Sequence, residues 1–277
     1  MWAACPNSKV LRGGCGLSCS QRYRAGQDGR RSLRAPLEDR LPHDAYELPA
    51  DQLRTLQEKA RAIGLWCVRT PAEYGGAGLN LLGQAVFAEE SARCRMGAYV
   101  PGCGAFGADP PNAIYMGSEY QIQKYAVPAA SVGKKVYVAI SESSGGADPA
   151  RSIRTRAVRR DGRYVLNGTK RYITNAPIAG LFSVMARTAP ERKASSISCF
   201  LVDAGTPGVT LGKPDKKMGQ AGALTCDVIF DNCRVPASAL LGGEEGNGFR
   251  TAMRVLDKGR LHISALCVGI AERLIRD

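Results

Sequence analysis

The stretch VYVAISESSGGADPARSIRTRAVRRDGRYVLNGTKRYIT, residues 136–174, organises the rest of the chain. It opens with an apolar run, 136–140, that ends in a loop of hydroxyl residues and glycines at 141–148. Two short segments rich in β-branched and aromatic residues follow, punctuated by Asp161-Gly162 and Asn167-Gly168. These dipeptides are hairpin signals, because glycine tolerates the positive φ of type I′ turns. We therefore expect antiparallel sheet with a polar, ligand-facing loop at one strand end.

The β pattern continues beyond this stretch to about residue 234. Parallel strands need long crossover connections, usually helices, and no helical pattern of sufficient length separates the candidate strands. The sheet is therefore expected to be antiparallel and to close into a barrel or sandwich. The candidate strands are 136–141, 152–159, 163–166, 170–174, 181–187, 196–203 and 225–230.

Helical periodicity precedes and follows the β region. Leu53, Leu56, Ala60 and Ile63 recur at spacings of three and four, and Gly64 is expected to end that helix in a left-handed conformation. Further helices are expected at 79–94, 112–118, 119–127 and from 249 to the end of the chain.

The last of these helices carries apolar residues on several sides. Such a helix needs neighbours on several sides, and the sequence up to Asp277 does not supply them. We therefore interpret the chain as C-terminally truncated.

Composition excludes several classes of protein. The 277 residues are 44% apolar, and no window approaches the roughly 18 consecutive apolar residues of a membrane span. The net charge of +13 includes an excess of bases in residues 1–35, which hold seven bases and one acid. Most other bases alternate with acids. A partner with phosphates is compatible with this pattern, whereas a nucleic-acid partner is not expected.

The cysteines and histidines indicate neither a metal site nor a disulfide scaffold. None of the ten cysteines forms a CxxC, and the two histidines, His43 and His262, lie far apart in sequence. Free thiols and a reducing compartment are expected. Residues 1–35 are rich in arginine, which is typical of an organellar transit peptide, but they lack an amphipathic pattern. We interpret them as a disordered tail or an extension.

Several motifs, in order along the chain, resemble one known family. They are LWCVRTPAEYGGAGL at 65–79, AISESSGGAD at 139–148, LNGTKRYITNA at 166–176, and the blocks 217–242 and 246–275. Together they resemble the acyl-CoA dehydrogenases, over about residue 45 to 277.

The resemblance implies an α+β fold with three parts. These are an N-terminal α-helical domain at 36–133, a middle antiparallel β-barrel or sandwich domain at 134–240, and the first helix of a truncated C-terminal helical domain at 241–277. It also implies FAD as cofactor, an acyl-CoA substrate, electron-transfer flavoprotein or a similar acceptor, and a homo-oligomer at full length. The implied location is the cytoplasm of a bacterium or the mitochondrial matrix of a eukaryote.

Site residues follow from the resemblance position by position. Ser141 matches the hydroxyl residue at the flavin's pyrimidine edge, Tyr172 the aromatic residue beside the flavin, and Thr174 the threonine near flavin N5. Asp257 and Arg260 match the pair that contacts the acyl-CoA substrate. Further contacts are expected from Val138, Ile140, Gly146 and Ile173 to FAD, and from Ala147 to both FAD and substrate.

Departures from the family pattern limit what the chain is expected to do. Ser143 replaces a proline, Ala147 replaces the loop serine that offers a hydroxyl, and Tyr172 replaces the usual tryptophan. One branch of the family places its base at the position of Gly259, which cannot act, and Glu142 is expected to bond backbone N–H groups. No catalytic base is therefore expected in this chain, since the usual glutamate would lie beyond residue 277.

Three functions remain open from the sequence. The leading hypothesis is an FAD-dependent acyl-CoA dehydrogenase, present as a fragment that is inactive alone. The alternatives are an oxidase of the acyl-CoA oxidase type, which passes electrons to oxygen, and a non-catalytic flavin- or CoA-binding homologue.

Overall fold

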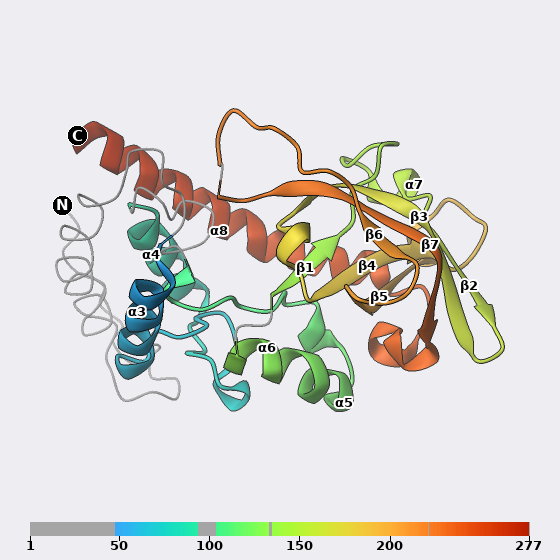
Figure 1. Cartoon of the computed structure of the whole chain (residues 1–277), viewed down its shortest axis with the longest axis horizontal. Coiled ribbons are helices and arrows are strands. Elements are labelled where there is room, and N and C mark those ends of the chain that lie inside the picture. The colour runs from blue at the N-terminus through green and yellow to red at the C-terminus, as the bar shows by residue number, and fades with distance from the viewer. Residues whose placement is uncertain (1–47, 94–103, 133–134, 221, 277) are drawn as a thin grey trace.

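The computed structural model describes residues 48–93, 104–132, 135–220 and 222–276, so the prediction for residues 1–35 lies outside it. Short helices form one end of the molecule, a curled sheet forms the other, and one long helix runs beside both (Figure 1). This arrangement confirms the fold class predicted from the sequence: N-terminal helices, a β domain, and the start of a C-terminal helical part.

The N-terminal helices follow their sequence signals closely. Helix α3 buries Leu56 and Ala60 and is followed by Gly64 at φ +71°, as predicted. Helix α4 starts after Asn80, whose side chain accepts a hydrogen bond from the N–H of Gly83. The helix predicted at 112–118 is only a 3₁₀ turn. The helical elements are α3 (Ala50–Ala62), η1 (Ala72–Tyr74), α4 (Leu81–Ala92), η3 (Ile114–Met116), α5 (Glu119–Gln121), the π-helical η4 (Ile122–Ala126) and α6 (Val127–Val132).

Seven strands build one sheet in the order β1-β4-β2-β3-β7-β6, with β5 paired to β4. A four-residue helix, α7 (Pro149–Ser152), connects the loop after β1 to β2. The strands are β1 (Val136–Ala139), β2 (Arg156–Arg160), β3 (Arg163–Thr174), β4 (Leu181–Arg187), β5 (Ile197–Asp203), β6 (Val209–Leu211) and β7 (Thr225–Pro236).

The prediction that the sheet is wholly antiparallel was wrong at two places. Strand β1 pairs parallel with β4, with Val136 opposite Leu181, and β2 meets β4 in parallel at Arg156 and Arg187. Parallel pairing requires a long connection but not a long helix. Here α7 and the β2–β3 hairpin form the connection between β1 and β4. The crossover is therefore present although the sequence shows no long helical pattern in this segment.

The two glycine turns predicted in the opening stretch behave differently. Asp161 and Gly162 have φ of +49° and +72° and join β2 to β3, as predicted. The predicted turn at Asn167-Gly168 was wrong, because β3 runs unbroken from Arg163 to Thr174 along β7. Gly168, at φ +148°, forms a bulge there, and a Cβ at this position would lie 2.5 Å from Thr155 Oγ1.

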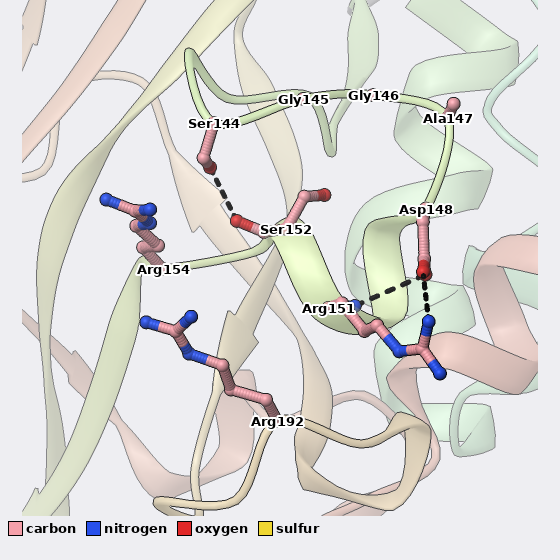
Figure 2. Close-up of a pocket in the computed structure, with 9 residues that line it drawn as sticks. All are labelled: Ser144, Gly145, Gly146, Ala147, Asp148, Arg151, Ser152, Arg154 and Arg192. Atoms are coloured by element: carbon pink, nitrogen blue, oxygen red, sulfur yellow. Dashed lines mark hydrogen bonds and ion pairs between the residues drawn. The ribbon is translucent and has the colours of Figure 1, made fainter.

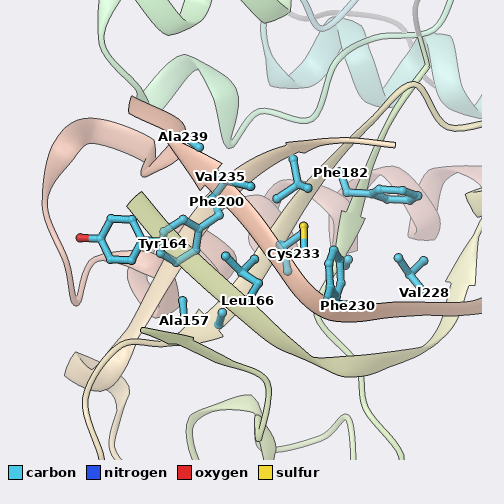
Figure 3. Close-up of a cluster of buried hydrophobic side chains, with 14 of the residues drawn as sticks. Ala157, Tyr164, Leu166, Phe182, Phe200, Val228, Phe230, Cys233, Val235 and Ala239 are labelled. Carbon is cyan, nitrogen blue, oxygen red and sulfur yellow. The ribbon is translucent and has the colours of Figure 1, made fainter. Parts of the chain in front are cut away.

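The sheet core lies between the curled strands (Figure 3). Tyr164 and Phe200 meet edge to face at 4.9 Å between ring centroids. Strands β4 and β5 are buried on both faces: Phe182 and Phe200 face the sheet core, whereas Leu181 and Leu201 face the helices. This double burial explains the continuous apolar runs of these two strands.

The long helix α8 (Gly248–Arg276) joins the two ends of the molecule (Figure 1). Its first turns pack on β5 and β4, and its later turns pack on α4. The crossing with α4 is close at Gly269, where a Cβ would lie 1.9 Å from the Glu89 carbonyl oxygen. Outside these contacts α8 exposes large apolar side chains, namely Leu256, Leu261, Ile263, Val268, Leu274 and Ile275.

Candidate functional site

The loop after β1 is anchored by a buried carboxylate. Glu142 Oε1 accepts hydrogen bonds from Lys170 Nζ at 2.7 Å and from the Thr155 hydroxyl at 2.7 Å, and Oε2 accepts from the Arg154 N–H at 2.6 Å. Lys170 is fully buried and also donates to the Ile140 carbonyl at 3.1 Å. The bonds confirm the expectation that Glu142 serves backbone N–H groups.

The charges of Glu142 and Lys170 depend on each other. Burial raises the pKa of Glu142, but the Lys170 charge and the donated hydrogen bonds outweigh it, so the net pKa is below its ordinary value. Burial lowers the pKa of Lys170 to about 8, and Glu142 opposes that shift. Glu142 is therefore an ionised, fully hydrogen-bonded group and a poor candidate for proton transfer.

Ser141 and Gly146 lie close together at the surface of this loop. A Cβ on Gly146 would lie 3.4 Å from Ser141 Oγ, so the loop backbone folds tightly over the serine hydroxyl. Ser141, Val138 and Ile140 are half-buried, and Ala147 is exposed. Ser141 and Gly146 are therefore neighbours in space, whereas Ile140 packs partly against the core that faces the helices.

The end of β3 lies against this loop. The Arg171 N–H donates to the Ser141 carbonyl at 2.8 Å, which fixes the two segments side by side. The next residue, Tyr172, has a left-handed φ of +57° and is 62% exposed, with the Arg171 guanidinium 4.8 Å from its ring centroid. Ile173 is turned into the core and Thr174 is half-buried. Contacts of Ile173 with a ligand are therefore limited to its backbone.

A pocket of about 440 Å³ opens beside the glycines of this loop (Figure 2). Arg154 and Arg192 lie on the same side of the loop, whereas Arg151 turns toward Asp148, 3.8 Å away. Ser152 Oγ is buried and has no hydrogen-bond partner. The lining residues up to Asp148 belong to the ligand-facing loop predicted from the sequence. Arg151, Ser152, Arg154 and Arg192 were not predicted, although the run of arginines in residues 151–160 was a visible signal. The lining consists of Ser144, Gly145, Gly146, Ala147, Asp148, Arg151, Ser152, Arg154 and Arg192.

Asp257 and Arg260 form an ion pair on the exposed side of α8. Among the described residues, no hydrogen bond or ion pair connects them to the loop after β1. Gly259, between them, faces open space, since a Cβ there would meet nothing within 4 Å. The structure therefore keeps the pair accessible to a ligand without joining it to the loop.

His262, one turn further along α8, packs toward the loop around Arg69. Burial lowers its pKa to about 4, and the Arg69 charge acts in the same direction. Asp109 holds that loop by accepting hydrogen bonds from the backbone N–H groups of Arg69 and Thr70, at 3.0 and 2.9 Å. His262 is thus a neutral packing residue at ordinary pH.

The described residues contain no group of three or more His, Cys, Asp or Glu side chains that could hold a metal ion. Within the part of the chain that the structure describes, no helix has the length and apolar character to cross a membrane.

Two family models match the chain. Residues 138–233 match the model described as acyl-CoA dehydrogenase, middle domain, and residues 27–133 match acyl-CoA dehydrogenase, N-terminal domain. Together they cover the N-terminal helices and nearly the whole sheet, but not α8.

Curated relatives agree with these matches. An acyl-CoA dehydrogenase of Bacillus subtilis is 39% identical over 219 residues, covering 78% of this chain and 57% of the relative. The human mitochondrial short-chain specific acyl-CoA dehydrogenase is 38% identical over 232 residues, covering 81% and 53%. The chain therefore spans somewhat more than half the length of these relatives.

Solved structures share the fold. One described as the electron transferring flavoprotein of Acidaminococcus fermentans aligns with a TM-score of 0.76 at 32% identity, covering 94% of this chain and 67% of that one. The prolyl acyl carrier protein oxidase AnaB aligns at 0.74 and 29%, covering 92% and 66%. An acyl-CoA dehydrogenase from Bacillus anthracis complexed with FAD aligns at 0.73 and 31%, covering 92% and 43%.

Proposed function

Because the chain belongs to the acyl-CoA dehydrogenase family, we propose that it binds FAD between the loop after β1 and the end of β3, and an acyl thioester beside it. Bound FAD would supply the redox chemistry by accepting hydride from the β-carbon of the thioester. The activity proposed for the complete protein is α,β-desaturation of that thioester. Within the chain we assign residues 36–133, 134–240 and 241–277 to the three family domains.

The residues present fit a flavin. Ser141 offers a half-buried hydroxyl, Gly146 allows close approach of the loop backbone, and Tyr172 offers an exposed aromatic face. We assign Ser141 to the polar edge of the ring, Tyr172 to its face, and Thr174 to a hydrogen bond near its reactive nitrogen. Val138, Ile140 and the backbone of Ile173 complete the expected contacts.

One observation carries this proposal more than the others. Tyr172 holds a left-handed conformation that costs a non-glycine residue about 1 kcal/mol, and it leaves most of its ring uncovered. Among the described residues, the Arg171 guanidinium meets the ring but does not cover it, so packing does not explain that arrangement. A planar ligand stacked on the ring, and held by Ser141 in the adjacent segment, does.

Flavin binding tests the proposal directly. The Kd for FAD, measured by flavin fluorescence and absorbance, is expected to rise about fivefold in Tyr172→Ala, because stacking of aromatic rings contributes about 1 kcal/mol. Tyr120→Ala is the matched control, since Tyr120 is 59% exposed on the distant helix α5. Failure to bind FAD, or an unchanged Kd in Tyr172→Ala, would contradict the proposal.

Asp257 and Arg260 are assigned to the thioester substrate, as is the backbone of Ala147. No general base is assigned to this chain, because Gly259 has no side chain and Glu142 is held by Lys170. We expect the chain alone to bind acyl-CoA without turning it over. Formation of enoyl-CoA by this chain alone would contradict that expectation.

The dehydrogenase and the oxidase hypotheses differ in the molecule that accepts the electrons. We propose electron-transferring flavoprotein as the acceptor, and a homo-oligomer for the complete protein. The oxidase remains the second candidate, because the carrier protein oxidase shares this fold. In a chain extended to full family length, reduction of a dye acceptor supports the dehydrogenase and dominant peroxide production supports the oxidase.

A further inference from the structure

Basic side chains gather around the pocket of Figure 2. The segment 149–160 contains five arginines and no acid. Arg154 and Arg156 project to the same side of their extended segment, and Arg192 approaches from the loop between β4 and β5. We call Arg151, Arg154, Arg156, Arg192 and Lys193, all exposed, the arginine face.

A buried arginine holds the arginine face together. The Arg187 guanidinium donates to the carbonyl oxygens of Ala150 at 2.9 Å, Ile153 at 3.1 Å and Glu191, and so ties α7 to the loop after β4. Burial lowers the pKa of Arg187, and the charges of Arg192 and Arg156 lower it further. Several positive charges are therefore held close together although they repel one another.

Little in the described part of the chain neutralises this charge. Asp148 faces Arg151 at 3.8 Å, and Glu142 is engaged by Lys170. The ion pairs of the described residues include none for Arg154 or Arg192. The buried Ser152 hydroxyl also has no partner. Two free guanidinium groups and an unused hydroxyl on one pocket are the groups that bind a phosphate.

The arginine face is wider than one phosphate requires. It extends from α7 across the start of β2 to the loop after β4, so Arg156 and Lys193 remain outside the pocket. A partner that presents one phosphate surrounded by carboxylates would match both parts by charge.

We propose that the arginine face docks an acidic carrier protein, which presents the acyl thioester on a phosphopantetheine arm. This rests on the proposed thioester function. Arg154 and Arg192 bind the phosphate, which coenzyme A thioesters also contain, and Arg156 and Lys193 bind carboxylates on the carrier. The chain then binds the carrier more tightly than it binds the coenzyme A thioester with the same acyl group.

Two double variants test the two parts of the arginine face. The probes are a butyrylated acidic acyl carrier protein and butyryl-CoA, with Kd measured by calorimetry on the FAD-loaded chain at low and high salt. R156Q/K193Q is expected to raise Kd for the carrier about tenfold, to reduce its salt dependence, and to leave Kd for butyryl-CoA within twofold. R154Q/R192Q is expected to raise the Kd for the carrier and the Kd for butyryl-CoA by about tenfold each. R54Q/K59Q, which removes the same charge from exposed positions on α3, changes neither.

Several outcomes would overturn the docking proposal. One is a carrier Kd no lower than that of butyryl-CoA, and another is a carrier Kd that R156Q/K193Q leaves unchanged. Binding of phosphatidylserine vesicles with the same sensitivity to R156Q/K193Q would assign the face to a membrane surface instead. FAD content is measured on each sample. A wild-type chain that does not hold FAD contradicts the proposed function, whereas a wild-type chain that holds FAD but does not bind the carrier overturns only the docking.

Discussion

At the scale of single residues, the buried Glu142–Lys170 pair is a contact of the site that is costly to break. Both side chains are almost fully buried, and breaking such a pair leaves an uncompensated charge in the interior. We predict that Lys170→Met lowers the free energy of unfolding by about 3 kcal/mol, measured by urea denaturation. The control Arg151→Met removes an exposed ion pair and is expected to cost less than about 0.5 kcal/mol. A loss below about 1 kcal/mol in Lys170→Met would show that the pair contributes little.

The same pair gives the protein an acid-sensitive component of stability. The folded pKa of Glu142 lies below its ordinary value of 4.5, so the folded chain binds fewer protons than the unfolded chain. Its contribution is present above pH 4.5 and is lost as the pH falls through the folded pKa. The difference in unfolding free energy between wild type and Glu142→Gln should therefore shrink between about pH 6 and pH 3. A difference that is independent of pH would contradict the shift.

At the scale of elements, Gly168 keeps β3 in one piece. An alanine there would combine a disfavoured φ with a Cβ 2.5 Å from Thr155 Oγ1 and 2.6 Å from Thr155 Cα. We predict that Gly168→Ala lowers the unfolding free energy by at least about 2 kcal/mol. Gly162→Ala is the matched control, because its φ is also positive but its Cβ would meet nothing within 4 Å. It should cost about 1 kcal/mol in the same denaturation experiment.

The crossing of α4 and α8 depends on a second glycine. Gly269→Ala would place a Cβ 1.9 Å from the Glu89 carbonyl oxygen, and backbone on both helices would have to move. We predict a loss of about 2 kcal/mol, seen as a lower Tm. Gly259→Ala on the same helix meets nothing within 4 Å and should raise stability by up to about 1 kcal/mol, because alanine favours helix. Equal effects of the two substitutions would mean that the crossing does not require glycine.

Periodicity and turn chemistry predicted helices and turns better than they predicted which strands pair. The helix ending before Gly64 and the turn at Asp161-Gly162 depend on neighbouring residues, so local patterns sufficed. The requirement for glycine at position 168 comes from the close approach of Thr155. The parallel pairing of β1 depends on β4, more than 40 residues away. Such partners leave no local signal.

The site was predictable only in part, for a related reason. Ser141 and Tyr172 were assigned to the proposed site through their motifs, and the structure adds that one hydrogen bond joins their segments. The grouping of Arg154 with Arg192 was not found, because the loop after β4 carries no motif and reaches the pocket only through the tertiary bonds of Arg187. A run of arginines predicts an exposed surface, but it does not predict which residues from other segments lie beside it.

At the scale of the whole molecule, the exposed side of α8 should control association. Leu274 and Ile275 are 72% and 84% exposed, and they are among several large apolar side chains that the helix leaves exposed. We predict that the chain self-associates at micromolar concentration, measured by sedimentation velocity, and that L274E/I275E shifts it toward the monomer. The control R54E adds negative charge on α3 and should leave association unchanged. A wild-type chain that stays monomeric would contradict the prediction.

The parallel contact between β1 and β4 has a kinetic consequence. The β2–β3 hairpin joins neighbours in sequence and can form early. Pairing of β1 with β4 is a contact between segments far apart in sequence, so it is expected to form later. The loop that follows β1 should therefore become protected late in refolding. In pulse-labelling hydrogen exchange, the amides of Arg154 and Thr155, which are bonded to Glu142, should gain protection after those of Val158 and Val165.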